Sequence, residues 1–367
     1  MTIVYIARSL SVSLRTGIAQ QLLCVAVLLL SSFSATAAAS VSSATKVVDP
    51  DAKIVRVVST LGVLGYLAQV IGGEFVTVEV LADPRQDPHH VKPLPTLMKR
   101  AREADLFIEV GLQLELWAEG VAVGSGNHSI QRGQVGRCVA SRNITAVDRP
   151  TSLSRELGDV HPDGNPHLWL DPVYASEMAS NIADSLAAVD PEHADAYQEN
   201  LEALQRRIDV ALFGAELVES VGSKKLIRLA KQNKLHEWLE LRGVSEMLGG
   251  WSLRAAELRG MKIVTYHKNW VYMASRFEVE IVIEIENKAG IAPSARHRDR
   301  VLEIIKKQDI PIILQANFYD RTASVYLAEA GGAVVISEPI DCGDVVNRPT
   351  YFDLIDGLLD SLLSRKK

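Results

Sequence analysis

The octapeptide Asn165-Pro166-His167-Leu168-Trp169-Leu170-Asp171-Pro172 constrains this chain more than any other stretch. Each proline disfavours helical backbone at the residue before it, so Asn165 and Asp171 are expected to be extended. Asp171 and Pro172 also fit the N-cap and first position of a helix. The segment is therefore predicted to be a stiff, extended arm that presents His167. A histidine with so little freedom suits a metal ligand, whereas a hydrogen-bonded core histidine is the simpler interpretation.

The first 39 residues have the pattern of a secretory signal peptide. Arginines precede an apolar run at 22–30, which is too short to span a bilayer comfortably, and Ala35-Thr36-Ala37 offers a cleavage site. Cys24 follows two leucines, which makes a poor lipoprotein site. We therefore expect residues 1–39 to be removed and the rest to be a soluble, periplasmic protein.

Strands and helices alternate in two separate parts of the chain. Such alternation predicts an α/β fold with parallel sheets. An amphipathic pattern from 192 to 217 separates the two parts and, as one helix, would span about 35–40 Å. The expected organisation is a lobe at 40–190, a rigid linking helix at 191–217 and a second lobe at 218–367, with a cleft between the lobes. The expected strands lie at 53–59, 75–81, 106–110, 262–266, 280–285, 311–315 and 333–336.

Charge and cysteine content narrow the range of partners. The formal charge of −6 and the absence of a long basic run argue against a nucleic-acid partner. Cys138 and Cys342 lie beyond the signal peptide, and export would permit a disulfide. Two buried, unpaired thiols are an equally good interpretation, so the pairing stays open.

Two more histidines are predicted to lie at the same edge of their sheets as His167. His89 is in the proline-rich loop after the strand at 75–81, and His267 ends the strand at 262–266. Ligands of open parallel sheets bind beyond the carboxyl ends of the strands. Three imidazoles suit Zn²⁺ and leave a fourth tetrahedral position. The combination predicts a metal site in the cleft.

Three motifs resemble those of the zinc/manganese solute-binding proteins of ABC transporters. The first is Asp87-Pro88-His89 with the later Leu114-Glu115-Leu116-Trp117, the second is the octapeptide, and the third is Val264-Thr265-Tyr266-His267-Lys268-Asn269-Trp270 with Arg276-Phe277. The resemblance covers nearly all of the chain beyond the signal peptide, and the three motifs together are specific. The resemblance implies two lobes joined by a rigid helix, a metal ion in the cleft, and a membrane permease as partner.

The same resemblance implies that His89, His167 and His267 are metal ligands. The family usually adds a carboxylate from the second lobe, and Asp341, after the last strand, is our preferred fourth ligand. The alternatives at this position are Glu338, Asp344, the thiolate of Cys342 or a water. The chain also departs from the family in two places: His161 is all that remains of a long histidine-rich loop, and residues 286–290 lack the usual prolines.

The sequence therefore predicts a monomeric, non-enzymatic binding protein that delivers a divalent metal ion to an ABC importer. Zinc is expected rather than Mn²⁺, because manganese prefers more oxygen ligands. Two alternatives come from other classes: a zinc-dependent hydrolase with an open water position, and a metal-containing surface adhesin. No His-Glu-x-x-His motif supports the hydrolase.

Overall fold

The computed structural model describes residues 54–150, 161–286 and 290–364. The predicted signal peptide and part of the loop before the octapeptide lie outside these residues. The segment Lys53–Lys367 forms one compact unit, and it contains two four-stranded sheets in which every strand pairing is parallel. The expected α/β architecture with two parallel sheets is confirmed.

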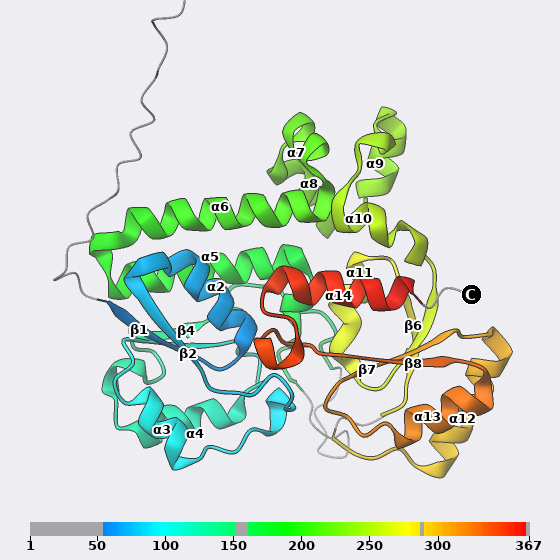
Figure 1. Ribbon diagram of the computed structural model, residues 1–367, viewed down its shortest axis with the longest axis horizontal. Helices are drawn as coiled ribbons and strands as arrows, with labels where there is room; N and C mark the ends of the chain where they lie inside the picture. The colour runs from blue at the N-terminus through cyan, green and yellow to red at the C-terminus, as the bar shows by residue number, and fades with distance from the viewer. Residues whose placement is uncertain (1–53, 151–160, 287–289, 365–367) are drawn as a thin grey trace, which may run out of the picture. The chain divides into compact units, whose positions relative to one another are not determined.

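The first sheet has the strand order β2-β1-β3-β4. Its central strands are rich in Val, Ile and Phe because helices cover both faces of the sheet. Helices α2 and α5 lie on one face, and α3 and α4 lie on the other (Figure 1). The short strand β4 was not expected from the sequence. The strands are β1 (Val55–Ser59), β2 (Val76–Val80), β3 (Leu106–Glu109) and β4 (Arg137–Val139), and the helices are α2 (Gly62–Gly72), α3 (Pro95–Ala101), α4 (Leu116–Ser125) and α5 (Pro172–Val189).

The second sheet repeats this topology with the order β6-β5-β7-β8. Helices α11 and α14 lie on one face, and α12 and α13 lie on the other (Figure 1). In both sheets the first strand of the lobe has a neighbouring strand on each side. A residue that follows it therefore lies near the middle of the sheet edge formed by the carboxyl ends of the strands. The strands are β5 (Lys262–Thr265), β6 (Glu280–Glu284), β7 (Ile312–Ala316) and β8 (Val334–Glu338), and the helices are α11 (Val271–Arg276), α12 (Ala295–Gln308), α13 (Thr322–Gly331) and α14 (Tyr351–Leu363).

The octapeptide is not extended throughout, which corrects the prediction. A 3-10 turn, η5 (Leu168–Leu170), lies between its two prolines. Proline restricts only the preceding residue, so the three central residues are free to turn. The turn buries Trp169 completely, and its indole N–H donates to the carbonyl of Ile340 in the second lobe. The arm is therefore fixed by packing as well as by its prolines.

The linking helix is shorter than expected. Helix α6 (Ala194–Phe213) ends at Gly214, whose φ of 87° lies outside the range of right-handed helix. Its 20 residues correspond to about 30 Å. Helix α6 lies beside α5 along its length (Figure 1), so the connection is braced by a second helix.

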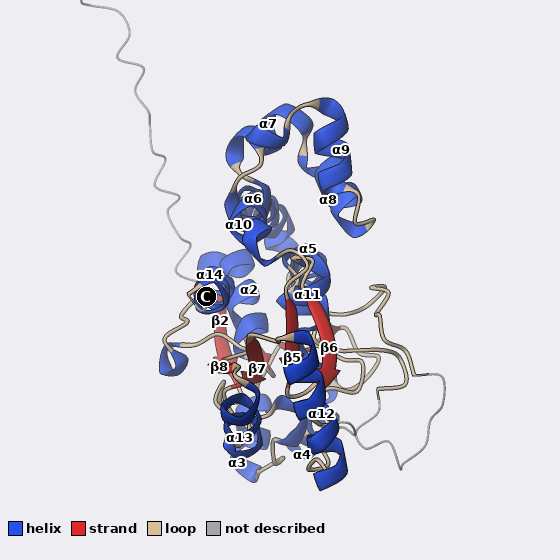
Figure 2. Ribbon diagram, turned by 90° about the vertical axis from the view of Figure 1, so that its right-hand side faces the viewer, coloured by secondary structure: helices blue, strands red, loops and turns tan. Residues whose placement is uncertain are grey.

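A helical segment follows α6 and projects away from both sheets (Figures 1 and 2). Its two ends meet, because the Gly249 N–H donates to the Phe213 carbonyl at 2.8 Å. A Cβ on Gly214 would lie 2.7 Å from the Cα of Gly249, so this approach requires glycine. The helices are α7 (Ala215–Val221), α8 (Ser223–Lys231) and α9 (Leu235–Arg242), after which α10 (Gly250–Arg254) returns the chain to the second lobe.

Two questions left by the sequence are answered by the described residues. Cys138 and Cys342 are both free and buried, so they do not form a disulfide in this structure. Among the helices of the described ranges, none has both the length and the apolar character needed to cross a membrane.

Candidate metal site

His89 is held at the end of the first sheet by its neighbours. It lies in the 3-10 turn η2 (Pro88–His90), where Asp87 is the N-cap and accepts from the His89 backbone N–H at 3.0 Å. The indole of Trp117, from the first family-like motif, donates to the Pro88 carbonyl at 2.8 Å. The motif thus fixes the loop that carries the histidine.

His167 is completely buried, and Asn165 sets its orientation. The Oδ1 of Asn165 lies 3.0 Å from both the backbone N and the ring Nδ1 of His167. The ring therefore carries its proton on Nδ1, which leaves the lone pair on Nε2. A metal-ligating histidine commonly has this arrangement, with one nitrogen donating to a protein oxygen.

His267 lies two residues after the end of β5 and has a carboxylate partner. Its Nδ1 donates to Oε2 of Glu286 at 2.7 Å, and both side chains are more than nine-tenths buried. Glu286 follows β6, the strand beside β5, so the sheet positions both members of the pair. This pair also leaves the Nε2 lone pair available.

The three histidines converge from different parts of the fold. Ring centroids are 5.4 Å apart for His89 and His167, 5.9 Å for His89 and His267, and 6.1 Å for His167 and His267. A tetrahedral zinc with bonds of about 2.0–2.1 Å would hold ring centroids roughly 5 Å apart. In the described ranges, no three His, Cys, Asp or Glu side chains already converge on one point as a complete metal cage. The three rings lie farther apart, by about 1 Å or less, than a bound zinc would hold them.

His161 joins this group, although the sequence placed it only in the preceding loop. Its ring centroid lies 5.0 Å from that of His89. Its Nδ1 lies 3.1 Å from the Leu112 carbonyl, which can only accept, so the Nδ1 carries the proton. No local sequence signal predicted that His161 lies beside His89, because the sequence of a loop does not show where the loop packs.

Asp341, the fourth ligand preferred from the sequence, has its carboxylate engaged by backbone groups. Its two carboxylate oxygens accept from the backbone N–H groups of Gly62, Val63 and Cys342 at 2.7–3.0 Å. None of the contacts found for Asp341 in the described residues involves a histidine. Burial raises its pKa to about 6, and the three N–H groups oppose that shift. Asp341 therefore stabilises the N-terminus of α2 from the second lobe.

Two other candidates for the fourth position are engaged or disfavoured, and a third is exposed. Glu338 accepts from Arg348 at 3.0 Å and from the Ser361 hydroxyl. Burial is the main reason that the pKa of the Cys342 thiol is raised above its usual range, which disfavours a thiolate. A side chain at Gly62 would clash with the Cys342 carbonyl, so this segment packs directly on α2. Asp344 begins a 3-10 turn after these residues and is exposed.

The electrostatic environment of two site histidines favours the neutral imidazole. Burial lowers the pKa of His89 and of His167 well below the ordinary value, and His161 and His267 lower both further. A neutral imidazole is the form that binds metal. His89 and His167 therefore present lone pairs at neutral pH without needing to lose protons first.

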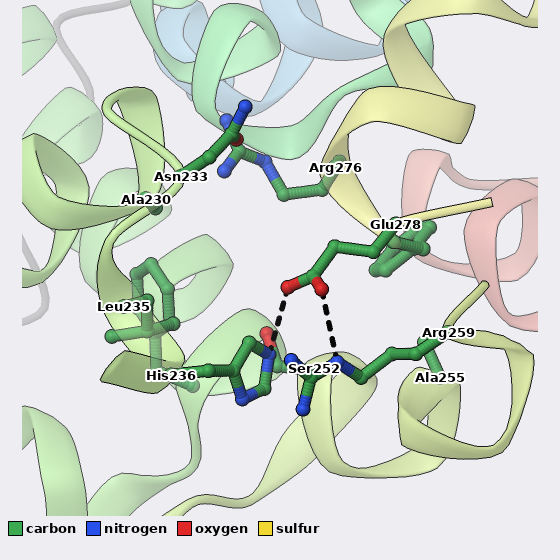
Figure 3. A pocket seen from close by; sticks show the side chains of 11 residues that line it. Ala230, Asn233, Leu235, His236, Ser252, Ala255, Arg259, Arg276 and Glu278 are labelled. Carbon is green, nitrogen blue, oxygen red and sulfur yellow. Dashed lines mark hydrogen bonds and ion pairs between the residues drawn. The ribbon is translucent and has the colours of Figure 1, made fainter. Parts of the chain in front are cut away.

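Two hollows are relevant. A small cavity of about 20 Å³, enough for about one water, is lined by Asp87, His89, His267, Glu286 and Tyr319 among others. A second hollow is not lined by any of the clustered histidines, and Glu278 bridges His236 and Arg259 there (Figure 3). Arg276, which is also drawn there, pairs with Asp171 instead. Of the two hollows, only the first adjoins the clustered imidazoles.

Comparison with known proteins identifies the family. The family model described as "Zinc-uptake complex component A periplasmic" matches residues 57–212 and 250–364. The iron-binding protein YfeA of Yersinia pestis is 27% identical over 315 residues, covering 85% of this chain and 86% of YfeA. The manganese-binding lipoprotein MntA of Halalkalibacterium halodurans is 24% identical, covering 56% of this chain and 64% of MntA.

A solved structure supports the fold independently. The crystal structure of ZnuA aligns with a TM-score of 0.64 and 19% identity, covering 86% of this chain and all of that chain. The family model leaves out 213–249, which contains the projecting helices, and includes all three histidine-bearing motifs. Because the match covers most of the sequence, this chain belongs to the family of zinc-uptake complex component A, whose members are metal-binding substrate-binding proteins of ABC transporters and not enzymes.

Proposed function

We propose that this protein captures zinc outside the cytoplasm and delivers it to the permease of an ABC importer. The observation that carries the proposal is the cluster of His89, His167 and His267, whose ring centroids lie 5.4–6.1 Å apart. The Nδ1 atoms of His167 and His267 are engaged by Asn165 and Glu286. Their Nε2 atoms are therefore the ligating atoms in this proposal.

His161 is our proposed fourth ligand in place of Asp341. Its ring lies beside His89, and its Nδ1–H faces the Leu112 carbonyl, which directs the lone pair to Nε2 as in His167 and His267. A site with four imidazoles would be richer in nitrogen than one that uses Asp341.

The donor set favours zinc over the metals for which two relatives are named. YfeA is named for iron and MntA for manganese. Imidazole suits zinc, copper, nickel and iron, whereas manganese prefers carboxylate, carbonyl and water oxygens. Copper and nickel would also bind in vitro, since affinities follow the Irving–Williams order. The proposal is therefore zinc as the physiological cargo, with manganese the weakest binder of the set.

Export and delivery complete the proposal. We propose that residues 1–39 direct secretion and that the processed protein acts as a periplasmic monomer. Contacts between the lobes support small movements on binding: Asn165 donates to the Lys268 carbonyl at 2.8 Å, and Tyr272 donates to the Asn165 carbonyl at 2.7 Å. Many buried apolar residues of both lobes also belong to one continuous core.

Titration calorimetry with zinc, manganese and ferrous iron tests the function. His89→Ala, His167→Ala and His267→Ala should each weaken zinc binding by more than the roughly 10- to 100-fold that loss of an outer contact costs. His161→Ala should have a smaller effect, since water can replace a fourth ligand, and the exposed His128→Ala is the control. Zinc binding that survives unchanged in His267→Ala would refute the site. A crystal measured at the zinc absorption edge would identify the ligands directly.

A further inference from the structure

A fully buried amide contacts the nitrogen through which His167 is proposed to bind metal. Asn269, two residues after His267, has its Nδ2 3.0 Å from Nε2 of His167. His167 belongs to the first lobe and Asn269 to the second. The hydrogen bond thus spans the lobes at the proposed ligating atom.

The direction of this hydrogen bond follows from its neighbours. Asn165 Nδ2 lies 2.8 Å from the Lys268 carbonyl, which can only accept, so the Oδ1 of Asn165 must face His167. An acceptor at Nδ1 requires the ring proton there. The Nε2 of neutral His167 is then an acceptor, and the group that contacts it must be the N–H of Asn269.

The hydrogen bonds of Asn269 lie on the N–H side of its amide. Its Nδ2 contacts His167, while its Oδ1 is buried with no hydrogen-bond partner among the described residues. The contact with His167 therefore holds the amide, although a buried, unpaired carbonyl oxygen is costly.

We propose that Asn269 competes with the metal ion for His167: its N–H occupies the Nε2 lone pair, and an ion can bind there only after the amide withdraws. The inference rests on the proposed function, because it takes Nε2 as the ligating atom. When the ion leaves, Asn269 gives the buried lone pair a partner again. Asn269 is thus a positioning residue that weakens binding and favours release, which a delivery protein needs.

Zinc affinity measured by competition with a chelator tests the proposal. Removing a typical hydrogen-bonding competitor changes an equilibrium constant by about 2- to 12-fold. Asn269→Ala should therefore bind zinc more tightly by about this factor and release it more slowly to excess chelator. Asn269→Ser is the second variant, because it keeps the buried position polar but cannot reach His167. Asn200→Ala is the matched control, since it removes an amide hydrogen bond from α6 to the Ile71 carbonyl of α2 and should not alter zinc affinity.

A spectroscopic readout separates competition from a purely structural role. Long-range ¹H–¹⁵N correlation of the chelator-treated protein should show His167 protonated on Nδ1, with an Nε2 shift that moves towards that of an unbonded nitrogen in both Asn269 variants. A proton on Nε2, or zinc affinity in both variants equal to or weaker than wild type, overturns the inference. If the wild-type protein binds no zinc, the proposed function is wrong as well. If wild type binds zinc tightly and both variants have the same affinity, only the competition by Asn269 is wrong.

Discussion

Arg276 and Asp171 form a buried, two-pronged ion pair between the lobes. Arg276 Nε donates to Oδ1 and Nη2 donates to Oδ2, both at 2.8 Å, and the side chains are 7% and 2% exposed. Asp171 Oδ1 also accepts from the Val173 N–H, so the same carboxylate caps α5. Asp171, a residue of the octapeptide, therefore both caps α5 and attaches the first lobe to the second.

Arg276→Ala should lower the free energy of unfolding by about 3–5 kcal/mol, because Asp171 would stay buried without its cation. Urea unfolding measures the change. Arg142→Ala is the control: its ion pair with Asp184 is exposed, with side chains 52% and 69% accessible, and should be worth at most about 1 kcal/mol. If both variants lost the same free energy of unfolding, the buried pair would contribute no more to stability than the exposed pair.

Asp341→Asn tests the reassignment of Asp341 from ligand to helix cap. The amide cannot accept as the carboxylate does from three N–H groups, so the free energy of unfolding should fall by about 0.5–2 kcal/mol. Zinc affinity, measured by calorimetry, should stay at the wild-type value. A loss of affinity as large as that of His267→Ala would restore Asp341 as a ligand.

Glu286→Ala should weaken zinc binding by roughly 10- to 100-fold, because His267 loses the acceptor that fixes its tautomer and ring orientation. Glu286→Gln should lie between wild type and Ala, since its amide oxygen can still accept from Nδ1. Glu280→Ala removes an exposed carboxylate from the same strand, β6, and is the matched control for charge. Competition titrations that rank these variants differently would contradict the orienting role of Glu286.

The buried histidines also predict how stability depends on pH. Unfolded histidine has a pKa of about 6.5, whereas burial holds the pKa of His89 and His167 well below their ordinary value. Below about pH 6.5 the unfolded chain takes up protons that the folded chain does not, so these residues reduce stability as pH falls. Their penalty is absent above about pH 6.5, where both states are neutral.

His167→Gln should therefore lose stability less steeply than wild type on acidification. The difference in slope is at most about 1.4 kcal/mol per pH unit, the value for one proton. Urea unfolding at about pH 7.5 and about pH 5.5, with chelator present, measures it. A variant whose slope equals that of wild type would show that the folded protein already protonates His167 as readily as the unfolded chain.

Much of the fold could be predicted because its signals are local. Each of the seven strands expected from the sequence overlaps an observed strand, because runs of apolar residues mark buried strands. The strand Arg137–Val139 was missed because its three residues look like part of a basic loop, and only pairing with β3 makes them a strand. The predicted end of α6 was too late, because the amphipathic pattern continues past Gly214 whereas the helical backbone ends there.

The candidate site could be predicted only in part. His89 and His267 follow strands, and the order of parallel strands brings such residues to one edge of each sheet. The nearness of His161, the cap formed by Asp341 and the contact of Asn269 depend on tertiary packing between segments far apart in sequence. The zinc hydrolase considered from the sequence is excluded by family, since the members are binding proteins.

The hydrogen bond between Phe213 and Gly249 has an evolutionary consequence. The segment between them leaves and rejoins the fold at one point, and the family model passes over 213–249. We expect that its excision, with a short bridging turn, would leave α6 and α10 in place. A single insertion or deletion at this point would thus add or remove these helices while the rest of the chain still folds. The same point offers a place to graft a fluorescent or affinity domain onto a working metal transporter component.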